Sequence, residues 1–146
     1  METLINKIKA LQNDGRGPCD ESIEFLESCK TPQEALDKAY WDYLEWLLNA
    51  LGIDYSREDA EFDSKCNVIG AEYESKLGVL RADYWANHDV IKDDDKSKID
   101  ALDGDYYSKR DVLRANYEPK RAAVLTEYTD SLRKLVVSQL LYFNEA

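Results

Sequence analysis

Residues 71–84 read AEYESKLGVLRADY, and residues 104–117 read GDYYSKRDVLRANY. The two segments are identical at eight positions and are offset by 33 residues, which is three times eleven. An eleven-residue period corresponds to three helical turns at about 3.67 residues per turn, so the repeated side chains stay on one face of a nearly straight helix. The repeat therefore predicts long α-helices of the coiled-coil type, and it is the strongest pattern in the chain.

The repeat extends well beyond these two segments, in three registers. The first register is aromatic at six of seven steps: Phe62, Tyr73, Tyr84, Asp95, Tyr106, Tyr117 and Tyr128. The second is apolar at every step: Ile69, Leu80, Ile91, Leu102, Leu113, Val124 and Leu135. The third is apolar at four of seven steps: Cys66, Leu77, His88, Ile99, Arg110, Arg121 and Leu132. We interpret the aromatic stripe as core or interface packing, which includes a self-association seam. A tyrosine recognition surface is the alternative.

Two architectures fit residues 56–146. An antiparallel hairpin would fold 57–92 against about 97–143 and would turn at Asp93, Asp94 and Asp95, the midpoint of the duplication, with Asp103-Gly104 as the other candidate break. It would also pair opposite charges, because residues 1–105 carry a net charge of −13 and residues 106–146 a net charge of +2. The unbroken phase through Asp95 favours a continuous rod, which would need a partner chain. We favour the hairpin, and we expect Pro119 to kink the helix or to begin a new one.

Residues 1–52 are predicted to form a small helical unit ahead of the repeat. Helices are expected at 3–12 and at about 19–29. A third helix should start at Thr31, with Pro32 at its first position and Glu34 completing a capping box, and should continue to Gly52. Ser56 followed by Asp59 should begin the next helix. The predicted fold class is therefore all-α, with an N-terminal unit at 1–52 and long helices of the repeat at 56–146.

Composition narrows the classes of function. The net charge of −11 argues against direct nucleic-acid binding, which needs a basic surface. We expect no membrane span, since no apolar run reaches about eighteen residues. The first twelve residues, METLINKIKALQ, lack the apolar region of a signal peptide, so a cytoplasmic protein is expected. Cys19, Cys29 and Cys66 fit no metal-ligand spacing and are expected to be structural thiols.

No catalytic motif is present in the sequence, and we expect no cofactor and no metal. The acidic cluster does not match the ligand spacing of a calcium loop, and we interpret it as a solvated turn: Asp93, Asp94, Asp95, Asp100, Asp103 and Asp105. All of these except Asp100 are candidates for contact with a partner. The lone His88 is interpreted as a partly buried structural residue.

Trp41 and Trp46 lie five residues apart on one predicted helix, so they point about 140° apart. Trp46 belongs to the face that we expect to be buried. Trp41 should be the more exposed of the two and is a candidate anchor for a protein partner.

The N-terminal third resembles a family of uncharacterised phage and prophage proteins. The matching residues run from a cysteine through a Thr-led helix to an Asp-aromatic-x-x-Trp-Leu sequence before a glycine: Cys19, Thr31, Ala35, Asp42, Tyr43, Trp46, Leu47 and Gly52. The family usually has Trp at the position of Tyr43 and Cys at the position of Lys38. These phage proteins often carry tandem eleven-residue repeats with a small-acidic-Tyr triplet, found here at 71–73, 82–84 and 104–106. The resemblance covers most of residues 19–130 and implies no enzymatic activity.

The sequence leads to an expectation of non-catalytic protein binding. The resemblance implies a phage gene that acts inside a bacterium. Its product could be an acidic inhibitor whose carboxylates imitate nucleic-acid phosphates and occupy the basic groove of a host nucleic-acid-binding or defence complex. A structural or oligomerisation coiled coil, including a homo-oligomer, is the alternative. An enzyme of unknown class is the least favoured reading.

Overall fold

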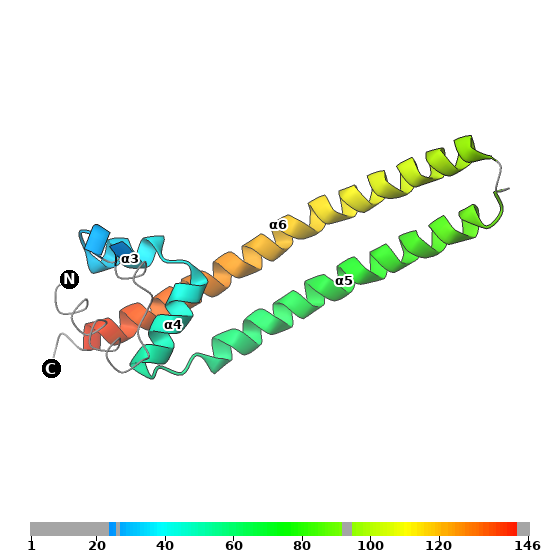
Figure 1. Cartoon of the computed structure of the whole chain (residues 1–146). Coiled ribbons are helices and arrows are strands. Elements are labelled where there is room, and N and C mark those ends of the chain that lie inside the picture. The colour runs from blue at the N-terminus through cyan, green and yellow to red at the C-terminus, as the bar shows by residue number, and fades with distance from the viewer. Residues whose placement is uncertain (1–23, 26, 92–94, 143–146) are drawn as a thin grey trace. The chain divides into compact units, whose positions relative to one another are not determined.

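The computed structural model describes residues 24, 25, 27–91 and 95–142, and this part of the chain contains helices and connections but no strands (Figure 1). The predicted all-α fold class is confirmed. Residues 24, 25, 27 and 28 are helical, in agreement with the helix predicted at about 19–29. The helix predicted at 3–12 and the predicted break after it lie outside the described residues, as does Cys19.

The helix predicted from Thr31 to Gly52 is two helices, so that prediction was wrong in its middle. α3 spans Pro32–Lys38 and α4 spans Trp41–Leu51, with Ala39 and Tyr40 in extended conformations between them. The predicted ends are correct. The Thr31 hydroxyl accepts the Glu34 N–H at 3.1 Å, although the Glu34 carboxylate reaches back to the Lys30 N–H. Gly52 ends α4 in the left-handed region, at φ 69°.

Two long helices follow. α5 spans Ser56–His88 and α6 spans Lys96–Tyr142. The first helical residue of α5 is Ser56 itself, and its N–H is accepted by the Asp54 carboxylate at 2.9 Å, so the predicted Ser56 cap is corrected to Asp54. α6 continues through both Gly104 and Pro119. Pro119 begins no new helix. Its missing N–H leaves the Ala115 carbonyl without a helical partner, but both residues lie on the exposed face, where water can bind that carbonyl.

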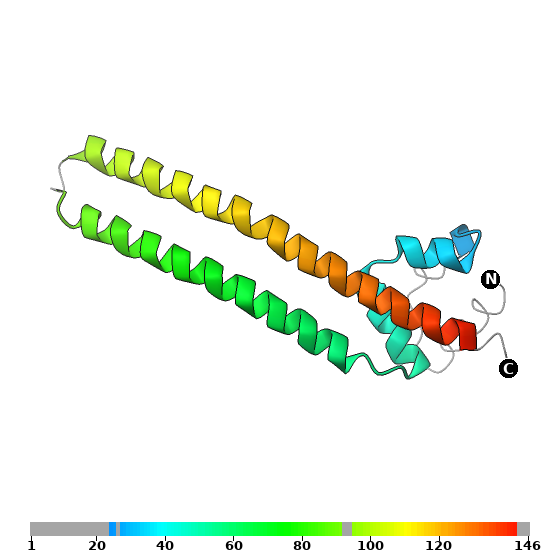
Figure 2. The same cartoon turned by 180° about the vertical axis from the view of Figure 1, so that it is seen from behind.

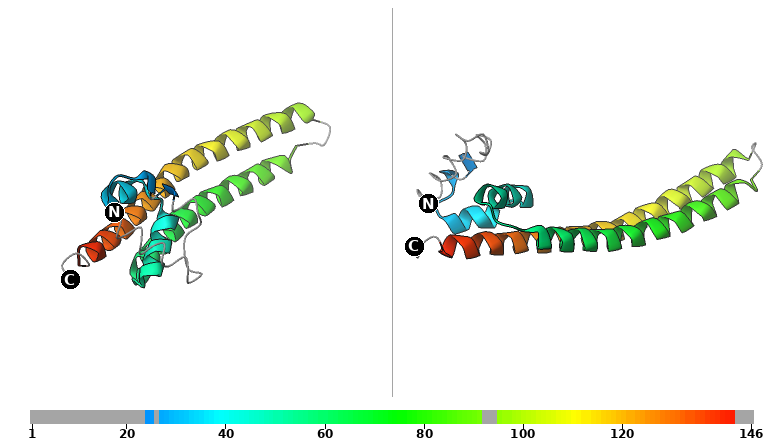
Figure 3. Two further views of the ribbon diagram at one scale, coloured as in Figure 1. Left: turned by 60° about the vertical axis from the view of Figure 1, so that its left-hand side comes forward. Right: turned by 90° about the horizontal axis from the view of Figure 1, so that it is seen from below.

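α5 and α6 form the predicted antiparallel hairpin over residues 62–124, where all views show them side by side (Figures 1, 2 and 3). Tyr73 pairs with Tyr117, their ring centroids 4.7 Å apart, and Tyr84 pairs with Tyr106 at 4.9 Å. An ion pair of 2.8 Å joins Lys120 of α6 to Glu72 of α5. The hairpin is thus confirmed for the single chain, and the chain reverses between His88 and Lys96.

The three registers of the repeat form the seam between these two helices. Between residues 62 and 124, every described register residue is at least half-buried except Arg121. Outside the registers, Lys65, Gly70 and Asp103 are the described residues of this stretch that are not exposed. The eleven-residue period therefore identified the packed face almost residue by residue, and the tyrosine stripe serves packing within the chain.

The chain divides into two compact units. Unit 1 comprises residues 1–61 together with 125–146, and unit 2 comprises the hairpin residues 62–124. The predicted boundary at residues 52–56 falls inside unit 1. The most deeply buried side chains of unit 1 come from α4 and from the last part of α6: Leu44, Leu47, Leu48, Leu132 and Val136. Residues near both ends of the described chain thus share one core.

Candidate protein-binding site

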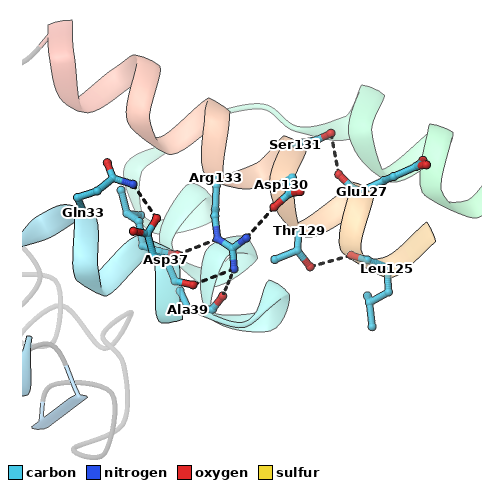
Figure 4. Close-up of polar contacts among 10 residues, drawn as sticks. Gln33, Asp37, Ala39, Leu125, Glu127, Thr129, Asp130, Ser131 and Arg133 are labelled. Atoms are coloured by element: carbon cyan, nitrogen blue, oxygen red, sulfur yellow. Dashed lines mark hydrogen bonds and ion pairs between the residues drawn. The ribbon is translucent and has the colours of Figure 1, made fainter. Parts of the chain in front are cut away.

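The junction between α3 and α4 is braced by one arginine of α6. The Arg133 guanidinium donates to the Leu36 carbonyl at 2.8 Å, to the Asp37 carbonyl at 3.2 Å and to the Ala39 carbonyl at 3.1 Å (Figure 4). These carbonyls are at the C-terminal end of α3, where i+4 N–H partners run out and where a cation is favoured by the helix dipole. The Leu36 carbonyl also accepts the Ala39 N–H at 3.3 Å. Asp130 holds the same guanidinium at 2.7 Å. The side chain therefore fixes the bend in the chain that sequence patterns did not predict.

A hollow of about 320 Å³ lies against this junction. Its wall is formed by residues of the α3–α4 junction and of α6: Asp37, Lys38, Ala39, Tyr40, Trp41, Leu125, Thr126, Thr129 and Arg133. Tyr40 is 79% exposed and Trp41 is 39% exposed. Two large aromatic side chains at the rim of a hollow form a surface of the kind that anchors protein partners.

Ring contacts hold the other side of α4 in the core. Tyr43 packs against Phe25 at 6.0 Å and against Trp46 at 5.6 Å between ring centroids. The Tyr43 hydroxyl is buried and has no hydrogen-bond partner among the described residues. Burial raises the pKa of Tyr43, and the nearby Cys29 thiol adds to the shift. Trp46 is half-buried and Trp41 is exposed, so the predicted order of exposure is confirmed.

Tyr128, the last residue of the aromatic stripe, joins three elements of unit 1. Its ring is buried, and its hydroxyl lies 2.6 Å from a Glu45 carboxylate oxygen of α4 and within hydrogen-bonding distance of Asp59 of α5. Burial, together with the carboxylates of Asp59 and Glu45, raises the pKa of Tyr128. The phenol stays protonated and can donate its single proton to either carboxylate. The contact ties α4, α5 and α6 together within unit 1.

The acidic charge of the protein is concentrated in unit 1. The residues of unit 1 include 17 acidic and 8 basic side chains, a net charge of −9. The residues of unit 2 include 13 acidic and 11 basic side chains, a net charge of −2. In two of the three triplets, the acidic residue pairs with a lysine four residues later: Glu72 lies 2.7 Å from Lys76, and Asp105 lies 2.7 Å from Lys109. In the third triplet, Asp83 accepts a hydrogen bond from the Asn87 side chain at 3.3 Å. The acidic residue of the small-acidic-Tyr triplet thus has a structural partner.

Unit 2 carries a second group of exposed aromatic side chains. Trp85 packs edge-on against Tyr84 and against His88, and Tyr107 packs edge-on against Tyr106 while the Arg110 guanidinium lies over its ring. Trp85 is 57% exposed. The half-buried His88 lies among these rings, as predicted for a structural histidine.

The predicted partner-binding residues have different surroundings. Trp41 lies at the hollow. Asp95 accepts the Lys98 N–H at 3.4 Å and begins α6, while Asp103 accepts the Tyr84 hydroxyl at 2.7 Å and Asp105 pairs with Lys109. These three aspartates therefore make contacts within the hairpin. Asp93 and Asp94 lie outside the described residues.

Tyr40 and Arg133 were missed because the sequence reading placed a continuous helix through Ala39. In such a helix Tyr40 would be one more surface position and Arg133 an unremarked cation of α6. No local signal distinguished Tyr40, because adjacent residues of one helix can both be buried, as Leu47 and Leu48 of α4 are. No local pattern pointed to Arg133, because its acceptors lie more than ninety residues away.

Comparisons with known proteins identify no relative. No family model matches the chain, no curated protein matches it, and no solved structure matches it. In the described part of the chain, every helix is too short or too polar to traverse a bilayer. Within the same residues, no three His, Cys, Asp or Glu side chains gather as they would around a metal ion.

Proposed function

We propose that this protein is non-catalytic and acts by binding another protein, with Tyr40 and Trp41 at the centre of the contact. The observation that carries the proposal is the exposure of these two aromatic side chains at the rim of the hollow at the α3–α4 junction. Tyrosine and tryptophan are the residue types most enriched among the side chains that dominate protein–protein binding energy.

The hollow is suited to receiving one side chain of the partner. Its volume of about 320 Å³ is near the lower end of the roughly 300–1,000 Å³ usual for ligand pockets. Arg133 and its three carbonyl acceptors hold the wall in place, so little conformational entropy is lost when a partner binds. A bulky apolar side chain would cover Trp41 and leave the polar rim hydrated.

The charge of unit 1 supports a basic partner. A net charge of −9 on the unit that carries the hollow attracts a positively charged surface and accelerates the encounter. In the phage setting implied by the resemblance, such a surface belongs to a host nucleic-acid-binding or defence complex, and the protein is its acidic inhibitor. The charge distribution favours unit 1, rather than rows of carboxylates along the hairpin, as the part that competes for the basic groove.

The test is affinity capture from bacterial lysate with tagged wild-type protein and two variants. Trp41→Ala removes the proposed anchor. Trp85→Ala is the matched control, because it removes a more exposed tryptophan that is not among the residues lining the hollow. We expect the wild type and Trp85→Ala to retain one stoichiometric partner, and Trp41→Ala to lose it. The partner should dissociate at high salt, since exposed opposite charges are screened.

Equal capture by all three proteins would contradict the anchor. Capture that is insensitive to salt would contradict the acidic-inhibitor form of the proposal and leave the anchor in place. Circular dichroism of Trp41→Ala must match the wild type, so that loss of binding is not loss of folding.

A structural coiled coil is the second candidate function, and one observation favours it. Four exposed valines recur at multiples of eleven residues in unit 2: Val68 and Val79 on α5, Val90 just after α5, and Val112 on α6. A regular apolar row on the surface can pack against a helix of the same period. Light scattering of the wild type and of a Val79→Lys, Val112→Lys variant tests this candidate: an oligomer that the variant abolishes would favour it, and a wild-type monomer would exclude it.

A further inference from the structure

The aromatic pairs of the hairpin follow one rule. Tyr73 contacts Tyr117 and Tyr84 contacts Tyr106, and in both pairs the residue numbers add up to 190. The centre of this pairing is residue 95, the one step of the first register that is not aromatic. Paired residues of the seam therefore lie at equal distances before and after residue 95, and like residues face one another across it.

The period of the repeat is not interrupted where the chain reverses. Ile91, Asp95 and Ile99 all fall on their registers, although the chain turns between His88 and Lys96. Residues 79–103 contain neither glycine nor proline. Nothing in the sequence of the turn forbids a continuous helix, and such a helix would carry the stripe through without a change of phase.

We propose that the hairpin seam is also an interface for a second copy of this chain, and that Asp95 keeps the chain in its closed form. In the exchanged dimer, α5 and α6 become one helix, and two such helices pack antiparallel about residue 95. Tyr73 of one copy then contacts Tyr117 of the other, and the Glu72–Lys120 ion pair re-forms between copies. The seam contacts are the same in both forms, so the relative stability of the two forms depends on the residues around position 95.

Asp95 favours the hairpin in two ways. In the closed form its carbonyl and carboxylate accept N–H groups of the first turn of α6, and its carboxylate pairs with the Lys98 ammonium at 2.5 Å. In the exchanged form it would lie within a helix and would face the same residue of the second copy. Two carboxylates would then oppose one another within an apolar seam, where like charges repel strongly.

The test replaces Asp95 by the residue type that the register predicts. Asp95→Tyr removes the cap and the repulsion and completes the aromatic stripe. We expect light scattering to give twice the wild-type mass of 16.8 kDa. Asp95→Leu serves as a second variant with the same expected result, in case the tyrosine does not fold. Asp100→Tyr is the matched control, because Asp100 is an exposed α6 residue off the stripe, and it should keep the wild-type mass.

Exchange is separated from any other dimer by two readouts. In small-angle scattering, one helix from Ser56 to Tyr142 spans roughly 130 Å, compared with roughly 70 Å for α6 alone. For the second readout, Asp95→Tyr proteins without native cysteines carry either Tyr73→Cys or Tyr117→Cys. They are mixed after unfolding and refolded. A disulfide between unlike chains is expected, since each chain carries one cysteine and positions 73 and 117 of different chains meet only in the exchanged dimer.

The inference is overturned if both Asp95→Tyr and Asp95→Leu keep the wild-type mass. It is equally overturned if they dimerise without the long dimension and without the unlike-chain disulfide. Loss of the partner captured through Trp41 has no bearing on this result. In the exchanged dimer, residues 1–61 of one copy pack with residues 125–146 of the other, so unit 1 and its hollow re-form between copies.

Discussion

At the scale of single residues, Arg133 stabilises the α3–α4 junction of unit 1, although no sequence pattern around it predicted this role. Arg133→Ala removes the guanidinium donor from three carbonyl groups, of which the Leu36 carbonyl keeps the Ala39 N–H, and removes the cation from the end of α3. We expect the free energy of unfolding to fall by about 2–3 kcal/mol. Chemical denaturation followed by circular dichroism measures the loss.

Two further variants separate geometry from charge at this position. Arg133→Lys keeps the charge but cannot reach three acceptors with one ammonium, so a loss between the wild type and the alanine variant is expected. Arg114→Ala removes an exposed arginine that pairs with Glu118 on the surface, and it should cost less than about 0.5 kcal/mol. Equal losses for Arg114→Ala and Arg133→Ala would contradict the bracing role of Arg133.

Removal of one hydroxyl group should have opposite effects at Tyr43 and Tyr128. The Tyr43 hydroxyl is buried without a partner, so Tyr43→Phe should raise the free energy of unfolding by about 1 kcal/mol. The Tyr128 hydroxyl lies between Glu45 and Asp59, so Tyr128→Phe should lower it by about 1–2 kcal/mol. Thermal unfolding of the two variants beside the wild type checks both signs. A loss of stability in Tyr43→Phe would mean that the hydroxyl has a partner.

Glu72 makes the hairpin sensitive to acid. Hydrogen bonds from Lys120 and Lys76 lower the pKa of Glu72 from 4.5 to about 2. Because the folded pKa is depressed, this stabilisation is fully present above about pH 4.5 and is lost as the pH falls towards about 2. We expect Glu72→Gln to flatten the dependence of the unfolding midpoint on pH across this window. An unchanged slope in Glu72→Gln would show that other carboxylates govern the acid response.

At the scale of the helices, two internal glycines lower the free energy of unfolding below what alanine would give at the same positions. Gly78 of α5 and Gly104 of α6 have open space where a Cβ atom would lie. Alanine at either position should raise the free energy of unfolding by about 0.5–1 kcal/mol, because glycine loses more backbone entropy in a helix. Gly52→Ala is the matched contrast, and it should destabilise the protein because φ is 69° there. Denaturant titrations of the three variants test these signs.

The helices also show how far the sequence could predict this fold. The repeat predicted α5, α6 and the buried face of the hairpin, because a constant period is read locally and needs no knowledge of the partner helix. Both ends of the predicted 31–52 helix were correct for the same reason, since Thr31 and Gly52 act within one turn.

The break at Ala39 could not be predicted in this way. Its causes are the burial of α4 in unit 1 and the hydrogen bonds of Arg133, and both depend on residues far away in the chain. Trp41 was found as an exposed anchor, but the hollow beside it was not, since its walls come from α6 as well as from the α3–α4 junction. Of the candidate aspartates, Asp95, Asp103 and Asp105 proved to be engaged inside the hairpin.

At the scale of the whole molecule, the pairing rule predicts which deletions the hairpin tolerates. Removal of residues 73–83 together with 107–117 takes one repeat from each arm and keeps every remaining register residue on the seam. We expect a cooperative unfolding transition at a lower midpoint, because one layer of core is lost. Removal of only 74–83 with 107–116 rotates the outer parts of the stripe by about 100° on each helix. That variant should lose cooperativity, and equal behaviour of the two would contradict the seam.

The same constancy of phase has a consequence for how such a chain changes over generations. The likeness of residues 71–84 to 104–117 is what tandem duplication of a coding segment leaves behind. A recombination event that adds or removes a whole repeat in both arms preserves the orientation of everything on either side of it. The length of the hairpin can therefore change between lineages while unit 1 and the turn of the hairpin are inherited unchanged. Selection can then act on the length of the hairpin without disturbing the fold.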